Sequence, residues 1–185
     1  MATVNPVKNI QHERMFVDYL KLNYKREALF WMISRYSGYR VSDLLEFTVS
    51  DIKDILKIDR FEIKERKTGK LRKVVLKPYL KKELKESIKD KADHEKLFRS
   101  RQGDNQSVSS RQMGRTLKQA AKEVGLKLNI GTHSGRKTFG YHLSEKSGLS
   151  LVQAIFGHST QLMTMIYIGV YEEMQDEAVM DIPDL

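Results

Sequence analysis

The sequence predicts a mainly α (α+β) domain in which helices surround one small antiparallel β-hairpin. Apolar residues recur at helical spacing through most of the 185 residues. The period changes once, at Phe61, where apolar and charged residues alternate on both sides of a Thr68-Gly69 turn. With 40% hydrophobic residues, the chain can bury the core of one compact domain.

The expected elements follow from capping residues and glycines that divide the apolar pattern into segments. The expected helices cover residues 11–24, 27–36, a stretch from about Ser42 through Phe47, 79–91, 111–124, 133–146, 151–156, 160–168 and 172–181. The hairpin strands are expected at residues 61–65 and 73–76, and residues 101–110 form a polar loop. Gly38, Gly125, Gly148 and Gly157 are expected to end helices, and Thr132 and Ser150 to cap the helices that follow them.

The balance of charges narrows the function. Lys and Arg number 33 against 24 Asp and Glu, a net charge of +9, and a field of this sign attracts polyanions such as nucleic acid. Cysteine is absent, which excludes disulfides, Cys-ligated zinc and thiol catalysis and fits a reducing cytoplasm. The sequence has no apolar run of about 18 residues and no N-terminal apolar stretch, so it predicts neither a membrane span nor a signal peptide.

Three short motifs carry residues of chemical interest. They are GYRVSDLL at residues 38–45, HSGRKTF at residues 133–139, and FGHST at residues 156–160, after which Tyr167 stands nine residues beyond His158. His133 and Arg136 are three residues apart on an expected helix and therefore share a face. Each motif alone has a simpler interpretation: a solvated arginine, a helix cap or a tyrosine packed in the core.

In their order and spacing, these motifs resemble the catalytic domain of tyrosine recombinases, the phage integrase family. The hairpin turn KTGKLR, residues 67–72, matches the lysine turn of that family, and the resemblance extends from about Lys21 to Tyr171. It implies six catalytic residues: Arg40, Lys67, His133, Arg136, His158 and Tyr167. Lys70 is the alternative to Lys67, and Tyr171 is the rival to Tyr167. The gap of nine residues after His158 favours Tyr167.

The resemblance implies strand transfer without ATP, metal or any other cofactor. Tyr167 is expected to attack a DNA phosphate and form a 3′-phosphotyrosyl link. His133 would act as the base, and Lys67 would protonate the departing 5′ oxygen. Arg40 and Arg136 suit bidentate contacts to the non-bridging phosphate oxygens.

The implied function is site-specific DNA recombination in the cytoplasm, for integration, excision or inversion. The implied partners are double-stranded DNA and further copies of the chain, as a tetramer on DNA, with a monomer possible in solution. Residues 1–185 are expected to form a single catalytic domain, and the N-terminal core-binding domain usual in the family is expected to be absent. The tail, residues 172–185, is expected to form a helix whose apolar side (Met174, Ala178, Val179) docks on a neighbouring protomer; packing within its own protomer is the alternative.

Two other functions remain open. One is a catalytically inactive DNA-binding accessory protein, which the six filled catalytic positions disfavour. The other is a type IB topoisomerase-like enzyme, which the compact size and the spacing of His158 and Tyr167 disfavour. Gly135 departs from the family pattern, which commonly has leucine between the histidine and arginine of the second motif. Six further basic residues are candidates for phosphate contacts or for a solvated surface: Lys25, Arg26, Arg99, Arg101, Arg111 and Arg115.

Overall fold

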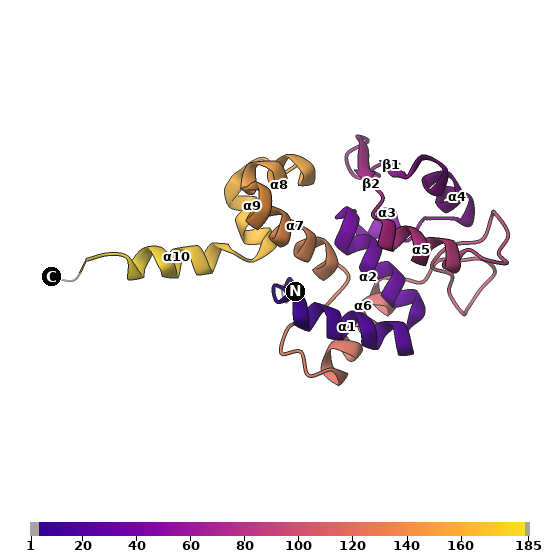
Figure 1. Ribbon diagram of the computed structural model, residues 1–185, viewed down its shortest axis with the longest axis horizontal. Helices are drawn as coiled ribbons and strands as arrows, with labels where there is room; N and C mark the ends of the chain where they lie inside the picture. Colours follow the sequence, from indigo (N-terminus) through magenta and orange to yellow (C-terminus); the bar gives the residue numbers. More distant parts are fainter. Residues whose placement is uncertain (1–3, 184–185) are drawn as a thin grey trace.

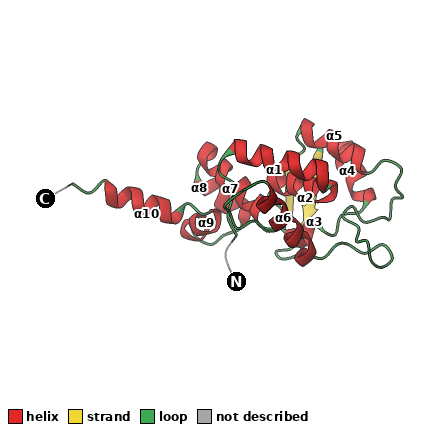
Figure 2. Ribbon diagram, turned by 90° about the horizontal axis from the view of Figure 1, so that it is seen from below, coloured by secondary structure: helices red, strands yellow, loops and turns green. Residues whose placement is uncertain are grey.

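The computed structural model describes residues 4–183. Over this range it contains ten helices and one two-stranded sheet. Figures 1 and 2 show a mostly helical molecule, with the short hairpin at the upper edge in Figure 1, between α4 and α8. The helices are α1 (Ile10–Asn23), α2 (Lys25–Ser37), α3 (Val41–Leu44), α4 (Val49–Ile58), α5 (Pro78–Ser87), α6 (Ser110–Glu123), α7 (Ser134–Ser147), α8 (Leu149–Phe156), α9 (Gln161–Ile168) and α10 (Tyr171–Met180). The mainly α (α+β) prediction is therefore confirmed. No helix within residues 4–183 has the length and apolar character needed to cross a membrane.

Helix α2 forms the centre of the main core. Every residue from Glu27 to Ser34 is buried, because α1, α6 and α7 all contact this helix. Trp31 packs edge-on against Phe16 of α1, with ring centroids 4.9 Å apart, and its indole N–H donates to Glu13 at 3.1 Å. The helix ends at Gly38, whose left-handed φ of 63° turns the chain into the first motif.

The hairpin packs on the same core through one aromatic anchor, the ring of Phe61. Strand β1 (Arg60–Lys64) pairs with β2 (Leu71–Val75) in antiparallel register, with Phe61 opposite Val74. Phe61 is only 1% exposed, and its ring packs against those of Tyr39 and Phe47. The anchor fixes the hairpin beside α2 and α3, so the exposed turn after β1 lies at the first motif.

Two of the expected helix boundaries are wrong, and one helix was not expected. The helix after Arg40 is a single turn, α3, that ends before Phe47. A separate helix that the pattern did not indicate, α4, then starts at a capping box formed by Thr48 and Asp51. Helix α5 stops at Ser87 rather than continuing to residue 91.

Two expected caps are also wrong. Thr132 does not cap α7, because His133 occupies the N-cap position and the Thr132 hydroxyl lies 3.4 Å from that of Ser110. Helix α8 begins directly after Gly148, and the Ser150 hydroxyl accepts a hydrogen bond from Gln161 instead. Both hydroxyls thus contact neighbouring segments rather than the start of a helix.

Gly135 has a physical reason in the crossing of α7 over α2. A Cβ added at Gly135 would lie 2.8 Å from the Ser34 hydroxyl oxygen and 2.9 Å from the Ser34 Cβ. The departure from the leucine usual in the family therefore goes with an unusually close approach of the two helices. This approach brings Arg136 down beside the end of α2.

Gly135→Ala is expected to destabilise the protein by about 1–3 kcal/mol, since the added methyl group overpacks the helix crossing. Gly114→Ala is the matched control. It also lies within a helix, but its Cβ would meet Thr132 at an ordinary 3.6 Å. The control is expected to gain about 0.5–1 kcal/mol from helix propensity. Thermal unfolding of both variants tests this; equal stabilisation by the two alanines would contradict the close crossing.

Helix α10 extends away from the rest of the molecule, as Figure 1 shows at its left side. None of its residues is buried. Its start is attached to the body by Lys8, whose ammonium donates to the Gly169 carbonyl at 2.7 Å and pairs with Glu173. Residues 184–185 of the predicted tail segment lie outside the described residues.

Candidate active site

The two motif arginines, 96 positions apart in the chain, meet at one point of the fold. Arg136 of α7 is 2% exposed; it donates a hydrogen bond to the Gly38 carbonyl and lies 4.0 Å from the centroid of the Phe156 ring. Arg40, at the start of α3, donates to the Phe156 carbonyl at 3.2 Å. The carbonyls of Gly38 and Phe156 thus hold the two guanidinium groups.

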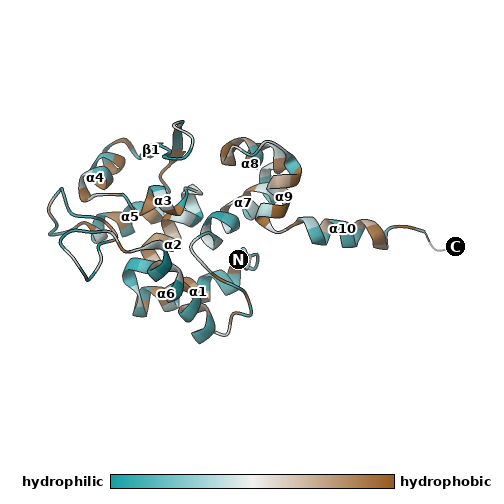
Figure 3. Cartoon of the chain, turned by 180° about the vertical axis from the view of Figure 1, so that it is seen from behind, coloured by the Kyte–Doolittle hydropathy of each residue, from teal (hydrophilic) through white to brown (hydrophobic). Residues whose placement is uncertain are grey.

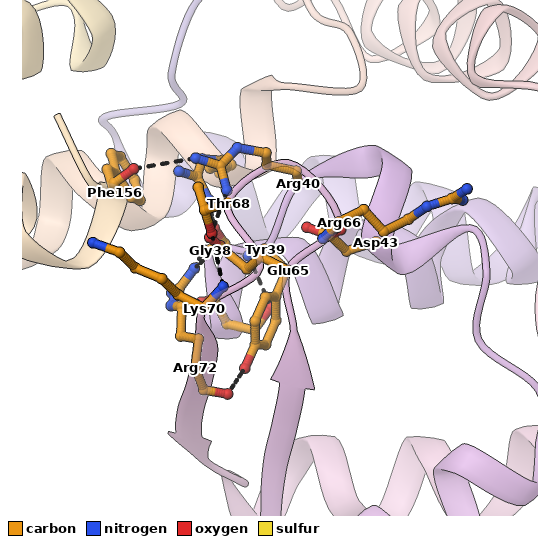
Figure 4. A network of polar contacts seen from close by, with 12 residues as sticks. Gly38, Tyr39, Arg40, Asp43, Glu65, Arg66, Thr68, Lys70, Arg72 and Phe156 are labelled. Carbon is orange, nitrogen blue, oxygen red and sulfur yellow. Dashed lines mark hydrogen bonds and ion pairs between the residues drawn. The ribbon is translucent and has the colours of Figure 1, made fainter.

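A buried carboxylate that the motifs did not indicate joins this arginine pair. Glu65, which follows β1, is 5% exposed, and its Oε2 lies 2.7 Å from Nη1 of Arg40. Its Oε1 lies 3.6 Å from Nη1 of Arg72. Figure 4 shows these side chains together with Thr68 of the lysine turn. Burial acts to raise the pKa of Glu65, but the contacts with Arg40, Thr68 and Arg72 outweigh it and lower that pKa.

Tyr167, on α9, lies beside Arg136. Its ring packs edge-on against those of Phe156 and His158, with centroids 5.5 and 5.3 Å away. Burial raises the pKa of the phenol, whereas a hydrogen bond and the charge from Arg136, together with the charge of Arg40, act to lower it. Because the net shift is upward, the phenol needs a base before it can act as a nucleophile.

Both motif histidines are neutral near pH 7 in this environment. His158 contacts the Thr164 hydroxyl through Nδ1 at 3.1 Å, and its pKa is lowered by burial and by the charges of Arg136, Arg40 and Lys67. The His133 side chain remains accessible at the start of α7. Its pKa is also lowered, first by desolvation from the surrounding atoms and then by neighbouring cations such as Arg136.

With His133 as the base that the resemblance implies, DNA cleavage is expected to stay fast at pH values somewhat below 6.5, the ordinary pKa of histidine. A base must be neutral, and lowering the pKa of His133 keeps it neutral to lower pH. Single-turnover rates should fall only when the pH drops through that lowered pKa. A His133→Gln variant should be slow, and its rate should no longer fall as the pH drops through this range. A rate that increases as the pH falls below 6.5 would contradict the assignment of His133 as base.

The two candidate lysines lie in the hairpin turn. The charge of Lys67 is one of the causes that lower the pKa of His158. Both side chains are exposed, and neither forms an ion pair with any residue in the range 4–183. The choice of Lys67 over Lys70 stays a prediction.

The rival Tyr171 lies in a different environment from Tyr167. Helix α9 ends at Gly169, which has a left-handed φ of 74°, so Tyr167 and Tyr171 are not one helical turn apart. Tyr171 instead lines a cavity of about 770 Å³ next to the N-terminal segment. Tyr39 of the first motif is fully buried, and its hydroxyl donates to the Arg72 carbonyl at 2.7 Å.

One further residue of the second motif gains a role that its position in the sequence did not indicate. Lys137 is 5% exposed, and its ammonium lies 5.2 Å from the centroid of the Tyr167 ring. Burial lowers its pKa. A cation over an aromatic face is attractive, so Lys137 helps to hold the Tyr167 ring. No spacing rule in the sequence could have indicated this contact, because α7 and α9 meet only in the folded chain.

Comparison with known proteins identifies the family of this chain. The profile of the Phage integrase family matches residues 8–174. The chain belongs to that family. The "Probable integrase/recombinase YoeC" of Bacillus subtilis (strain 168) is 35% identical over 174 residues, which cover 94% of this chain and 93% of the relative. "Tyrosine recombinase XerC" of Thermodesulfovibrio yellowstonii is 34% identical over 142 residues, but the match covers only 46% of that longer protein.

Solved structures agree on the fold of this integrase. The crystal structure of XerA recombinase superimposes with a TM-score of 0.72 at 18% identity, over 100% of this chain and 68% of XerA. A lambda integrase dimer bound to a COC′ core site gives a TM-score of 0.67 at 19% identity, over 92% and 62% of the two chains. The predicted tyrosine recombinase catalytic domain is thus confirmed, and with it the prediction of a site-specific recombinase, an enzyme that breaks and rejoins DNA.

Proposed function

We propose that this integrase cuts DNA with Tyr167 as its nucleophile and holds the cut end as a 3′-phosphotyrosyl link. The observation that carries the proposal is the position of the phenol next to His158 and Arg136, with Arg40 joined to the same point through Phe156. Two arginine cations thus act on a half-buried tyrosine. Such donors stabilise the charge that develops on a phosphate in the transition state.

The proposed residues account for each bond and each proton of the cleavage step. The Tyr167 oxygen bonds to phosphorus while the bond from phosphorus to the 5′ oxygen breaks. His133 takes the phenol proton, and Lys67 gives a proton to the departing oxygen. Rejoining is the reverse reaction, in which a 5′ hydroxyl attacks the phosphotyrosine. The energy of the broken bond stays in the new link, so the cycle needs no nucleotide.

The proposed phosphate contacts use the N–H donors of Arg40 and Arg136 that do not bind protein carbonyls. Each guanidinium uses some of its N–H groups on protein carbonyls and keeps others for the non-bridging oxygens. His158 can donate to the same oxygens through Nε2 when the Thr164 hydroxyl donates to Nδ1. Arg40, Arg136 and His158 together would then surround the phosphate.

Incubation with a nicked suicide duplex tests the proposal. The duplex is selected from a random-sequence pool by its binding to this chain, and the nick lets the short 5′-hydroxyl fragment diffuse away. We expect a covalent protein–DNA band in EDTA and without nucleotide, because the cations of the site replace a metal. DNA binding without any adduct would instead support the inactive accessory protein.

For partners, we propose double-stranded DNA and a tetramer on that DNA. The lambda integrase structure is of a dimer bound to a core site, which supports assembly of this family member on DNA as well. The net charge of +9 favours binding to the phosphate backbone. A cytoplasmic location, where DNA is accessible, is part of the same proposal.

Helix α10 is proposed to connect the protomers. It exposes Met174, Val179 and Met180 by 44, 64 and 83%, and Figure 3 shows brown and teal segments alternating along it. The helix is also acidic, and the cavity of about 770 Å³ near its start is lined by Lys8, Lys127 and Lys137 together with Glu172 and Glu173 of the helix itself. DNA phosphate repels an acidic helix, so an exposed acidic and apolar helix suits the protein surface of another copy better.

Truncation after Glu173 is expected to leave the melting temperature of the free monomer nearly unchanged, since no residue of α10 is buried. Assembly on DNA should be lost, as measured by native gel shift and sedimentation. Val179→Ser should weaken assembly, and Gln175→Ser serves as its control on a polar residue of the same helix. A large fall in melting temperature of the truncated monomer would support packing of the tail in its own protomer instead.

A further inference from the structure

The strongest observation that the mechanism leaves unused is the buried carboxylate of Glu65. Within residues 4–183, it is the acidic side chain that forms ion pairs with both Arg40 and Arg72. A buried carboxylate without a partner would be costly, but this one sits among cations that compensate its charge. Its place in the fold, directly before the turn that carries Lys67, points to a role beyond charge balance.

One oxygen of Glu65 contacts both parts of the machinery. Oε2 lies 2.7 Å from Nη1 of Arg40 and accepts a hydrogen bond from the Thr68 hydroxyl at 2.9 Å. Thr68 is the neighbour of Lys67 in the turn. A single atom, Oε2 of Glu65, therefore connects Arg40 with Thr68, the neighbour of the proposed proton donor Lys67.

We propose that Glu65 is a positioning residue that couples the Lys67 turn to Arg40, so that the acid and the phosphate-binding arginine are oriented together. This inference rests on the function proposed above, with Lys67 as the proton donor. Glu65 acts through Arg40 and Thr68 and does not itself touch DNA in this account.

The turn needs such a tether because its own side chains are exposed. Residues 66–70 are exposed at the tip of a hairpin of five residue pairs. Backbone bonds close the turn, from the Glu65 N–H to the Lys70 carbonyl and from the Gly69 N–H to the Glu65 carbonyl. A second carboxylate, Asp43 of α3, accepts from the Arg66 N–H at 3.0 Å. Asp43 fixes the backbone at Arg66, whereas Glu65 holds the Thr68 side of Lys67.

The coupling also accounts for how the cations coexist without DNA. Arg40 and Arg72 meet on opposite oxygens of the same carboxylate, and the charge of Glu65 also acts on Arg136. The carboxylate offsets the mutual repulsion of these guanidinium groups. It thereby keeps Arg40 in one orientation before phosphate arrives, and preorganised donors are the effective ones.

A substrate with sulfur in place of the bridging 5′ oxygen separates the two roles of Glu65. A thiolate leaves without a proton from Lys67, since a thiol has a pKa of about 8.5. The test measures single-turnover cleavage of the selected nicked duplex in both forms. Lys67→Ala is the reference variant. It should cleave the oxygen substrate slowly and the sulfur substrate at the wild-type rate.

Thr68→Val, which is nearly isosteric, should be about 10- to 100-fold slower on the oxygen substrate, as expected for a misplaced acid. On sulfur it should cleave like the wild type, because only the link to Lys67 is broken. Glu65→Gln should be slower on both substrates, with the larger loss on oxygen, because it disturbs Arg40 as well. Glu62→Gln is the control, since Glu62 forms an exposed ion pair with Lys73 in the same hairpin; it should match the wild type.

Melting temperatures of all variants verify that they are folded. Wild-type rates on oxygen for Thr68→Val and Glu65→Gln would overturn the coupling, and so would equal losses on oxygen and sulfur. Failure of the proposed function looks different. In that case the wild type itself forms no adduct with either substrate, or Lys67→Ala is not restored by sulfur.

Discussion

Tyr167→Phe is expected to abolish the covalent protein–DNA adduct while leaving DNA affinity nearly unchanged. The substitution removes one oxygen atom, and the ring contacts with Phe156 and His158 remain. The fold around α9 should therefore persist, so that only the nucleophile is lost. Adduct formation on the nicked duplex and DNA binding by fluorescence anisotropy measure the two properties separately.

Tyr171→Phe provides the matched control. Tyr171 has the same chemistry, but it begins α10 beyond the Gly169 turn and lines the cavity near the N-terminal segment. This variant should form the adduct at the wild-type rate. An adduct that survives Tyr167→Phe and disappears with Tyr171→Phe would reverse the assignment of the nucleophile.

Arg40→Ala and Arg136→Ala are each expected to slow cleavage by about two to three orders of magnitude, the usual cost of a lost transition-state donor. The two should differ in stability. Arg136 is 2% exposed and packs on the Phe156 ring, so its loss also leaves a cavity and lowers the melting temperature. Arg40 is partly exposed, and its loss leaves Glu65 with fewer counter-charges.

Lysine should restore little at either position. A lysine ammonium cannot bind a protein carbonyl and two phosphate oxygens in the fork geometry of a guanidinium. Single-turnover rates of Arg40→Lys and Arg136→Lys test this, with Arg14→Ala on the exposed surface of α1 as the control. Cleavage by the lysine variants at close to the wild-type rate would refute the bidentate contacts.

The sequence predicted the elements whose own residues determine them. The periodic apolar patterns of α1, α2 and α6 and the alternation around Phe61 were sufficient to place those helices and the hairpin. Helix α4 was not found, although Thr48 and Asp51 form a capping box at its start. The expected caps at Thr132 and Ser150 failed because tertiary contacts occupy those hydroxyls.

The same distinction holds for the site. The motifs identified the residues whose chemistry is characteristic, and the fold brings Arg40, Arg136, His158 and Tyr167 together. The motifs did not indicate Glu65, because a glutamate after a strand is common and its importance depends on where Arg40 and Thr68 lie in three dimensions. The structure likewise explained Gly135, since only the crossing of α7 over α2 shows why a side chain does not fit there.

The most direct test of the account is to identify the linkage in the covalent complex. The adduct formed by the wild type on the nicked duplex in EDTA is digested with protease and nuclease, and the modified peptide is sequenced by mass spectrometry. We expect a 3′-phosphate joined to the oxygen of Tyr167 and a released fragment with a free 5′ hydroxyl. A link at Tyr171, a 5′-phosphate link, or an adduct that forms only with Mg²⁺ would contradict it.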